Sequence, residues 1–143
     1  FDLREAVFER IDLLVDPERV KVFEGNNVFI YSDSQLVSII IANLLYNALK
    51  YSPDQSDVTV RISQQIRERR PGASLLVTNR IGPAGEPDAE KVFQKYYRAK
   101  KAEGKSGSGL GLYLTAGIAD LLGGVATHRT LDSRIEFELW LPD

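Results

Sequence analysis

The segment from Ser32 to Pro53 constrains the fold of this chain most, because it has the pattern of one long amphipathic helix. Ser32 with Gln35 three residues later is the pattern of a capping box, which satisfies two backbone N–H groups at a helix start. Pro53 lacks a backbone N–H and ends the helix. Apolar residues recur at helical spacing between these ends and predict a stripe buried against another layer: Leu36, Val37, Ile40, Ile41, Leu44, Leu45 and Ala48.

The same helix carries a polar face beside the apolar stripe. Four polar residues follow one another at offsets of zero, four, seven and eight, so they share one side of the helix: Asn43, Asn47, Lys50 and Tyr51. Amide oxygens are ligands that suit Mg²⁺, an ammonium group suits phosphate, and a tyrosine ring suits stacking. A solvated polar stripe has the same spacing, so this face alone leaves both interpretations open.

A glycine-rich run precedes a second apolar helix, which we predict from Leu110 to Leu122 with a stop at Gly123. Glycines let backbone N–H groups approach phosphate oxygens closely, and the positive end of the following helix adds to the attraction. Because one segment suits phosphates and the other suits a metal and a base, the two together predict a nucleotide site. The residues expected to line the phosphates are Gly107, Ser108, Gly109, Leu110 and Gly111.

The rest of the pattern mixes helices and strands. Residues 3–15 predict a first helix, and residues 88–95 predict a short one that Asp88 caps. Val20–Phe23 and Val28–Ile30 flank a turn signal and predict a hairpin. Blocks of helices and antiparallel strands favour an α+β fold with one helical layer on one sheet. Further strands are expected within residues 58–62, 74–78, 125–129 and 135–141, with a charged turn over residues 67–72.

Composition narrows the possible functions. A chain of 143 residues is long enough for one domain with a core, and a net charge of −2 gives no electrostatic reason to expect a nucleic-acid partner. The absence of cysteine excludes a disulfide framework and a thiolate site. No apolar stretch approaches the roughly 20 residues of a membrane helix, and there is no signal peptide. We therefore expect no direct membrane contact from this chain.

About thirty residues separate the strand that ends near Asn79 from the helix that begins near Gly109, with one short helix between them. A connection of this length is uncommon in a compact domain and is typical of a functional lid. Its cations would lie near a triphosphate, although a solvated basic loop has the same composition. These cations are Lys95, Arg98, Lys100, Lys101 and Lys105.

Three segments in this order resemble motifs of sensor histidine kinases: Asn43–Pro53 the N box, Phe93–Arg98 the F box and Gly107–Leu112 the G2 box. The resemblance runs over almost the whole chain. It implies that residues 1–143 form a single catalytic, ATP-binding domain with the Bergerat two-layer α/β sandwich of gyrase, Hsp90 and MutL. That sandwich has a mixed, mostly antiparallel sheet covered on one face by helices, and a long ATP lid, here at about residues 80–108.

The resemblance also implies roles for single residues. Mg²⁺ is expected on Asn47 with Asn43 assisting, phosphates on Lys50 and Arg98, and adenine near Tyr51 and Asn79. Tyr97 joins the nucleotide-binding set and, with Phe93, is expected to anchor the lid by packing. The candidate catalytic residues are Asn43, Asn47, Lys50 and Arg98, and the candidate nucleotide-binding residues are Tyr51, Asn79, Gly82, Gly85, Tyr97, Gly107, Ser108, Gly109, Leu110 and Gly111.

One segment departs from the motif. The G1 box of the family reads Asp-x-Gly-x-Gly, whereas this chain has Asn79 at the aspartate position and an insertion that displaces Gly82 and Gly85. In the family the aspartate accepts a hydrogen bond from the adenine amino group. The Asn79 carbonyl oxygen can accept the same bond, more weakly because it is neutral. Alternatively, Asn79 only ends its strand as a turn former.

Asn43 distinguishes related functions. ATPases of the superfamily carry glutamate there as a general base for water, and an amide cannot take that proton. The resemblance therefore implies that the chain holds ATP for another nucleophile, a histidine on a dimerisation domain upstream of Phe1 that is absent from this chain. His128, the only histidine, is expected to be structural or exposed.

ATP and Mg²⁺ are thus the expected ligands. The implied partners are the histidine-bearing dimerisation domain of the same kinase and the receiver domain of a response regulator. The domain is expected to be cytoplasmic, within a parent protein anchored in the bacterial inner membrane. Two alternatives remain open: a degenerate domain that binds nucleotide weakly or not at all and acts as a regulatory scaffold, and a serine kinase of the anti-sigma type.

Overall fold

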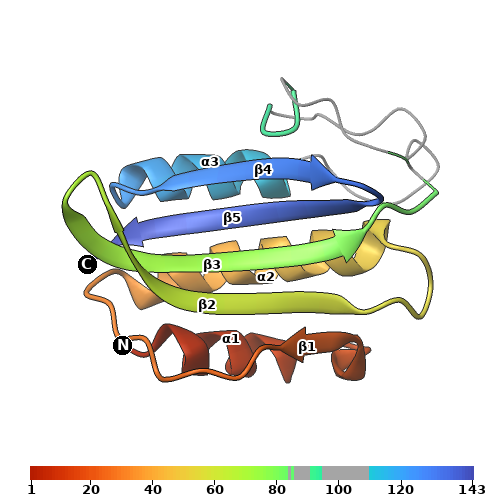
Figure 1. The fold of residues 1–143 in the computed structure, drawn as a ribbon, viewed down its shortest axis with the longest axis horizontal. Coiled ribbons are helices and arrows are strands. Elements are labelled where there is room, and N and C mark those ends of the chain that lie inside the picture. The colour runs from red at the N-terminus through yellow and green to blue at the C-terminus, as the bar shows by residue number, and fades with distance from the viewer. Residues whose placement is uncertain (84, 86–90, 95–109) are drawn as a thin grey trace.

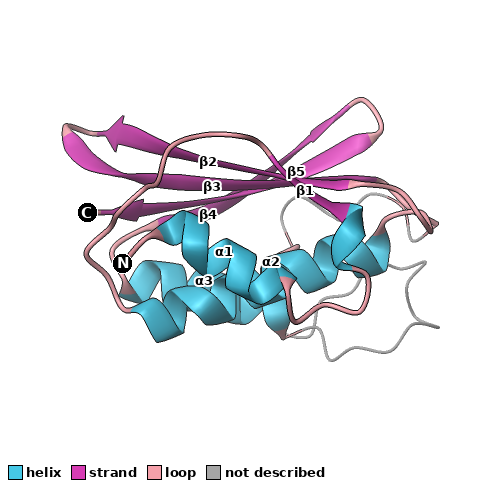
Figure 2. Ribbon diagram, turned by 90° about the horizontal axis from the view of Figure 1, so that it is seen from below, coloured by secondary structure: helices cyan, strands magenta, loops and turns pink. Residues whose placement is uncertain are grey.

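The computed structural model describes residues 1–83, 85, 91–94 and 110–143. Its elements form two layers, a five-stranded sheet and a layer of helices (Figure 1). Figure 2 shows the helices on one side of the sheet, and no helix of the described residues lies on the other side. The elements are α1 (Leu3–Ile11), η1 (Pro17–Arg19), β1 (Val20–Val22), α2 (Ser34–Tyr51), β2 (Val58–Arg67), β3 (Arg70–Arg80), α3 (Gly111–Leu121), β4 (Val125–Leu131) and β5 (Arg134–Pro142).

The strands are arranged in the order β1-β2-β3-β5-β4. Among the strands in the described part of the chain, β1 and β2 pair in parallel, and the three other pairs are antiparallel. The last strand in the sequence therefore lies between β3 and β4. The predicted α+β fold, with a mixed and mostly antiparallel sheet covered by helices on one face, is confirmed.

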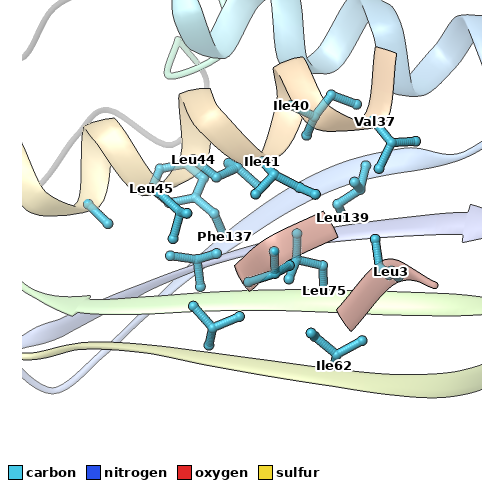
Figure 3. Close-up of a cluster of buried hydrophobic side chains, with 14 of the residues drawn as sticks. Leu3, Val37, Ile40, Ile41, Leu44, Leu45, Ile62, Leu75, Phe137 and Leu139 are labelled. Carbon is cyan, nitrogen blue, oxygen red and sulfur yellow. The ribbon is translucent and has the colours of Figure 1, made fainter. Parts of the chain in front are cut away.

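The predicted apolar stripe of α2 is buried against the sheet, except for Leu36, which is half-buried. Figure 3 shows Ile41 and Leu45 of α2 close to Phe137 and Leu139 of β5. Six α2 residues are no more than 3% exposed: Val37, Ile40, Ile41, Leu44, Leu45 and Ala48. Within the described residues, no helix combines the length and the apolar character needed to cross a bilayer.

The start of α2 differs from the prediction by one residue. Asp33, and not Ser32, is the N-cap, and its Oδ1 accepts hydrogen bonds of 3.0 Å from the backbone N–H groups of Gln35 and Leu36. A carboxylate is a stronger hydrogen-bond acceptor than a hydroxyl, and its negative charge is attracted to the positive end of the helix dipole. The helix ends at Tyr51, before Pro53, as predicted.

The predicted hairpin between Val20–Phe23 and Val28–Ile30 is wrong. β1 pairs in parallel with β2, where Val20 lies opposite Val58. Residues 28–30 run beside the N-terminus instead, because the Leu3 backbone N–H donates to the Val28 oxygen at 2.8 Å. Both segments therefore pair with distant parts of the chain and not with each other, and these pairings bury Val20, Val28 and Ile30.

Three further boundaries differ from the prediction. The first helix ends at Ile11, four residues earlier than expected. The charged turn between β2 and β3 contains only Glu68 and Arg69, both with positive φ, so β3 already begins at Arg70. Lys91–Gln94 forms a hydrogen-bonded turn, while Asp88 and Lys95 of the predicted short helix lie outside the described residues.

Removing the N-cap of α2 should destabilise the fold. We expect Asp33→Ala to lower the free energy of unfolding by about 1 kcal/mol, because two backbone N–H groups lose their acceptor. Urea denaturation followed by circular dichroism measures this loss. Ser32→Ala is the matched control and should change the free energy of unfolding very little. A larger loss for Ser32→Ala than for Asp33→Ala would instead support Ser32 as the cap of a capping box.

Candidate functional site

The candidate site lies where the C-terminal half of α2, the end of β3 and the start of α3 meet. These three ends lie on the same side of the molecule in Figure 1. Asn43, Asn47, Lys50 and Tyr51 come from α2, Asn79 from β3, Gly82 and Gly85 from the turn after β3, and Leu110 and Gly111 from the start of α3. Arg98, Tyr97, Gly107, Ser108 and Gly109 lie outside the described residues.

Asparagine side chains of α2 contact the start of α3. Asn43 Nδ2 donates a hydrogen bond of 3.3 Å to the Gly111 carbonyl oxygen, and Thr115 Oγ1 donates to the same oxygen at 3.0 Å. A Cβ at Gly111 would lie 3.4 Å from Asn47 Nδ2 and 3.7 Å from Asn43 Oδ1. The missing side chain of Gly111 therefore keeps space open beside both amides, and the two segments that the sequence linked by chemistry are adjacent.

The start of α3 is suited to an anion. Leu110 is its N-cap residue, and an apolar side chain cannot accept hydrogen bonds from the first turn. The first backbone N–H groups of a helix have no acceptor within the helix, and the helix dipole gives this end a partial positive charge. Because Gly111 adjoins Asn43, this positive end lies beside the amide face of α2.

Lys50 and Tyr51 form the end of the polar face of α2. The Lys50 ammonium nitrogen lies 5.3 Å from the centre of the Tyr51 ring and 5.4 Å from the centre of the Tyr46 ring. Attraction between a cation and the faces of aromatic rings favours this placement. One cation and one aromatic ring are therefore held together within one turn of Asn47.

Asn79 is buried at the end of β3, with 4% of its surface exposed. Its Nδ2 donates a hydrogen bond of 2.7 Å to the Arg80 carbonyl oxygen. A carbonyl oxygen can only accept, so this contact determines which end of the amide is nitrogen and which is oxygen. The amide oxygen then remains as an acceptor, and a purine amino group needs an acceptor as its hydrogen-bond partner.

Gly82 joins the turn after β3 to the end of α2. A Cβ at Gly82 would overlap the Tyr51 carbonyl oxygen, so only glycine permits this approach. Gly85 has a φ of 78°, and its backbone N–H donates to the Gly82 oxygen at 3.0 Å. Both displaced glycines are therefore required by the backbone conformation of this turn.

An aromatic cluster lies where the segment before residue 95 meets the sheet. Phe93 packs edge-on against His128 at 5.7 Å and against Phe137 at 6.1 Å between ring centres, and neighbouring Val92 is 3% exposed. Phe93 thus has the packing contacts expected of an anchor. His128 lies half-buried in β4, and its ring centre is 5.9 Å from that of Phe137, so the three rings form a triangle.

Sequence reasoning missed Thr115 and Arg19. Thr115 follows Gly111 by four residues, the spacing at which a hydroxyl reaches a backbone oxygen within a helix, so a signal existed. Arg19 donates hydrogen bonds to residues at the end of α2, and no pattern around Arg19 indicates this contact.

Comparisons with known proteins agree on one family. The family described as histidine kinase-, DNA gyrase B-, and HSP90-like ATPase matches residues 32–143. Sensor histidine kinase HprS of Escherichia coli strain K12 is 28% identical over 138 residues, which are 96% of this chain and 29% of that protein. Sensor-like histidine kinase SenX3 of Mycobacterium tuberculosis strain H37Rv is 39% identical over 105 residues, which are 70% of this chain and 24% of that protein.

Solved structures have the same fold. The mycobacterial sensor histidine kinase MprB superposes with a TM-score of 0.78 at 26% identity, over 99% of this chain and 95% of that chain. A nucleotide-free form of the catalytic domain of histidine kinase ThkA superposes with a TM-score of 0.73 at 18% identity, over 99% and 94% of the two chains. The chain spans less than a third of the length of the curated relatives that it matches.

The orientation of the Asn79 amide can be tested by changing its donor to an acceptor. Asn79→Asp sets a carboxylate oxygen against the Arg80 carbonyl oxygen in a buried position. We expect a loss of about 1–3 kcal/mol in the free energy of unfolding at neutral pH, measured by urea denaturation. Burial and the repulsion from the Arg80 oxygen raise the pKa of the introduced carboxyl in the folded protein. The folded state therefore binds a proton more tightly than the unfolded state, and the free energy of unfolding should recover as the pH falls.

Asn79→Ala is the control for this prediction, because it removes the donor without adding a charge. The difference in free energy of unfolding between Asn79→Ala and the parent protein should be no smaller at acidic pH than at neutral pH. Unchanged stability of Asn79→Asp at neutral pH would mean that the amide is not held by the Arg80 oxygen.

Proposed function

This chain belongs to the family of histidine kinase-, DNA gyrase B- and HSP90-like ATPases, and we propose that it transfers the γ-phosphoryl group of ATP to a histidine on a separate dimerisation domain. Its similarity to sensor histidine kinases in sequence and in fold identifies it as an ATPase domain of the histidine-kinase type. The observation that carries the proposal is the contact between the asparagines of α2 and Gly111 at the start of α3.

The asparagine face fits a magnesium ion. Amide oxygens are hard, neutral ligands, and a metal that also binds phosphate oxygens needs few ligands from the protein. Asn47 would supply the main oxygen and Asn43 would assist, beside the space that Gly111 leaves open. A Mg²⁺ ion held by these two asparagines would supply positive charge that offsets the negative charge of the ATP phosphates.

The other site residues have complementary roles. Lys50 and Arg98 would neutralise phosphate oxygens, and the backbone N–H groups of residues 107–111 would bind the same oxygens. The Asn79 amide oxygen would accept from the adenine amino group, beside the Tyr51 ring. Gly82 supports this arrangement, because the Gly82 turn lies directly against Tyr51.

Asn43 favours a kinase over an ATPase. An amide accepts no proton at neutral pH, so Asn43 cannot activate water for attack on ATP. We infer that a histidine ring nitrogen of the partner domain attacks the γ-phosphorus. One N–P bond forms, the bond to the bridging oxygen breaks, and ADP leaves. The domain contributes mainly the positions of the reactants and the neutralisation of charge.

The remaining parts of the system belong to the same proposal. The histidine would lie on the dimerisation domain of the same kinase, and the phosphoryl group would then pass to the receiver domain of a response regulator. The parent protein would be anchored in the bacterial inner membrane, with this domain in the cytoplasm.

Binding of ATP should depend on Mg²⁺ and on Asn47. We expect the 143-residue chain to bind ATP saturably in isothermal titration calorimetry, with much weaker binding in EDTA. Asn47→Ala should weaken Mg²⁺–ATP binding by about 10- to 100-fold while leaving the melting temperature nearly unchanged, because Asn47 lies outside the buried stripe. No saturable binding at millimolar ATP would favour a scaffold role instead.

Gly111→Ala should separate stability from binding. The added methyl group would contact both asparagine amides at van der Waals distance, so the fold accommodates it and the helix gains up to about 1 kcal/mol. Because the methyl group fills the space beside Asn47, we expect the affinity for Mg²⁺–ATP to fall in the same titration while the melting temperature holds or rises.

Gly117→Ala is the matched control, because a Cβ there meets no atom within 4 Å. It should raise the melting temperature at least as much, because Gly117 lies inside α3 whereas Gly111 is its first residue, and it should leave Mg²⁺–ATP affinity unchanged. Equal affinities for the two variants would remove Gly111 from the binding site.

A further inference from the structure

Arg19 makes an unusual number of contacts with one short stretch of chain. It is the last residue of η1, directly before β1, and its guanidinium group donates hydrogen bonds to four oxygens. All four acceptors lie at the end of α2 or in the loop that follows it. They are Ser52 Oγ at 2.8 Å, Ser56 O at 3.0 Å, Pro53 O at 3.1 Å and Leu49 O at 3.4 Å.

These contacts supply hydrogen-bond donors to polar groups at the C-terminal end of α2. The last carbonyl groups of a helix have no N–H partner within the helix, and the Leu49 oxygen is one of them. Ser52 is the C-cap residue and is 3% exposed, so its hydroxyl also needs partners inside the protein. A guanidinium group presents its donors in a rigid plane, so it holds several acceptors at fixed relative positions.

The turn that Arg19 holds is the turn that carries two of the proposed nucleotide-binding residues. Lys50 and Tyr51 lie in the sequence between the acceptors Leu49 and Ser52. On another side, the Tyr51 carbonyl oxygen lies against Gly82 so closely that no Cβ fits. The end of α2 is therefore fixed by Arg19 and by the turn after β3.

We propose that Arg19 is a positioning residue for nucleotide binding, acting through the end of α2. Arg19 makes none of its hydrogen bonds with the candidate site residues, so its effect on ATP passes through the placement of Lys50 and Tyr51. Displacements of about 1 Å at such groups are enough to change a reaction strongly. This inference rests on the proposed function, since it assigns Lys50 and Tyr51 to ATP.

Arg10 offers a matched control within the same protein. Its Nε donates a hydrogen bond of 2.6 Å to Ser38 Oγ, so Arg10 also ties a preceding segment to α2. Ser38 lies eleven residues before Leu49, which places this tie roughly 16 Å away along the helix. Arg10 makes this tie through one hydrogen bond where Arg19 uses four, so its loss tests how untying a preceding segment from α2 affects the protein away from the site.

The test compares Arg19→Ala with Arg10→Ala. Both variants should lower the melting temperature, but only Arg19→Ala should weaken Mg²⁺–ATP binding, by about tenfold in titration calorimetry at a temperature where both are folded. Arg19→Lys keeps the charge and loses the planar set of donors, so it should restore only part of the affinity. Parent-like affinity of Arg19→Ala, or an equal loss in Arg10→Ala, would overturn the inference.

Hydrogen exchange gives a second readout that does not depend on ATP. We expect faster amide exchange at residues 49–52 in Arg19→Ala than in Arg10→Ala, because the last turn of α2 loses its partner. Unchanged exchange there would show that Arg19 does not hold this turn. If the parent protein bound no nucleotide, the proposed function would fail, while the exchange data would still decide whether Arg19 positions the end of α2.

Discussion

Burial of the apolar stripe of α2 against the sheet is the interaction on which the rest of the structure depends. Ile40, Ile41 and Leu45 are almost completely buried, and each buried methylene group contributes about 0.8 kcal/mol. This burial also fixes the rotation of the helix about its axis. With the stripe on the sheet, Asn43 reaches the Gly111 oxygen of α3. The same apolar contacts that stabilise the fold therefore orient the amides of the candidate site.

Sequence patterns predicted the elements whose signals are contained within one segment. The helices α2 and α3 have their apolar spacing and their stop signals within about twenty residues, so periodicity was sufficient. The pairing of Val20 was not predictable in this way, because its partner Val58 lies far along the chain. A charged turn was expected over residues 67–72, but its two residues with positive φ, Glu68 and Arg69, could not be located within that range because neither residue type favours this conformation.

Some residues of the candidate site could also be predicted from local patterns, and others could not. Helical offsets were enough to place Asn43 and Asn47 on one face, and the glycine-rich run was enough to indicate the start of α3. The orientation of the Asn79 amide depends on the Arg80 carbonyl oxygen, whose direction is determined only by the folded backbone. The contacts of Arg19 depend on where η1 directs a single side chain, and one arginine in a charged segment carries no pattern.

The strand order β1-β2-β3-β5-β4 has a consequence for how the protein is made. A ribosome produces β5 after the other four strands of this sheet, yet β5 is the strand that pairs with both β3 and β4. Until residues 134–142 leave the exit tunnel, the edge of β3 stays unpaired in the nascent chain, and unpaired edges are prone to aggregation. A nascent chain that stops short of β5 thus contains every residue of the candidate site and lacks the strand that completes the sheet beneath them.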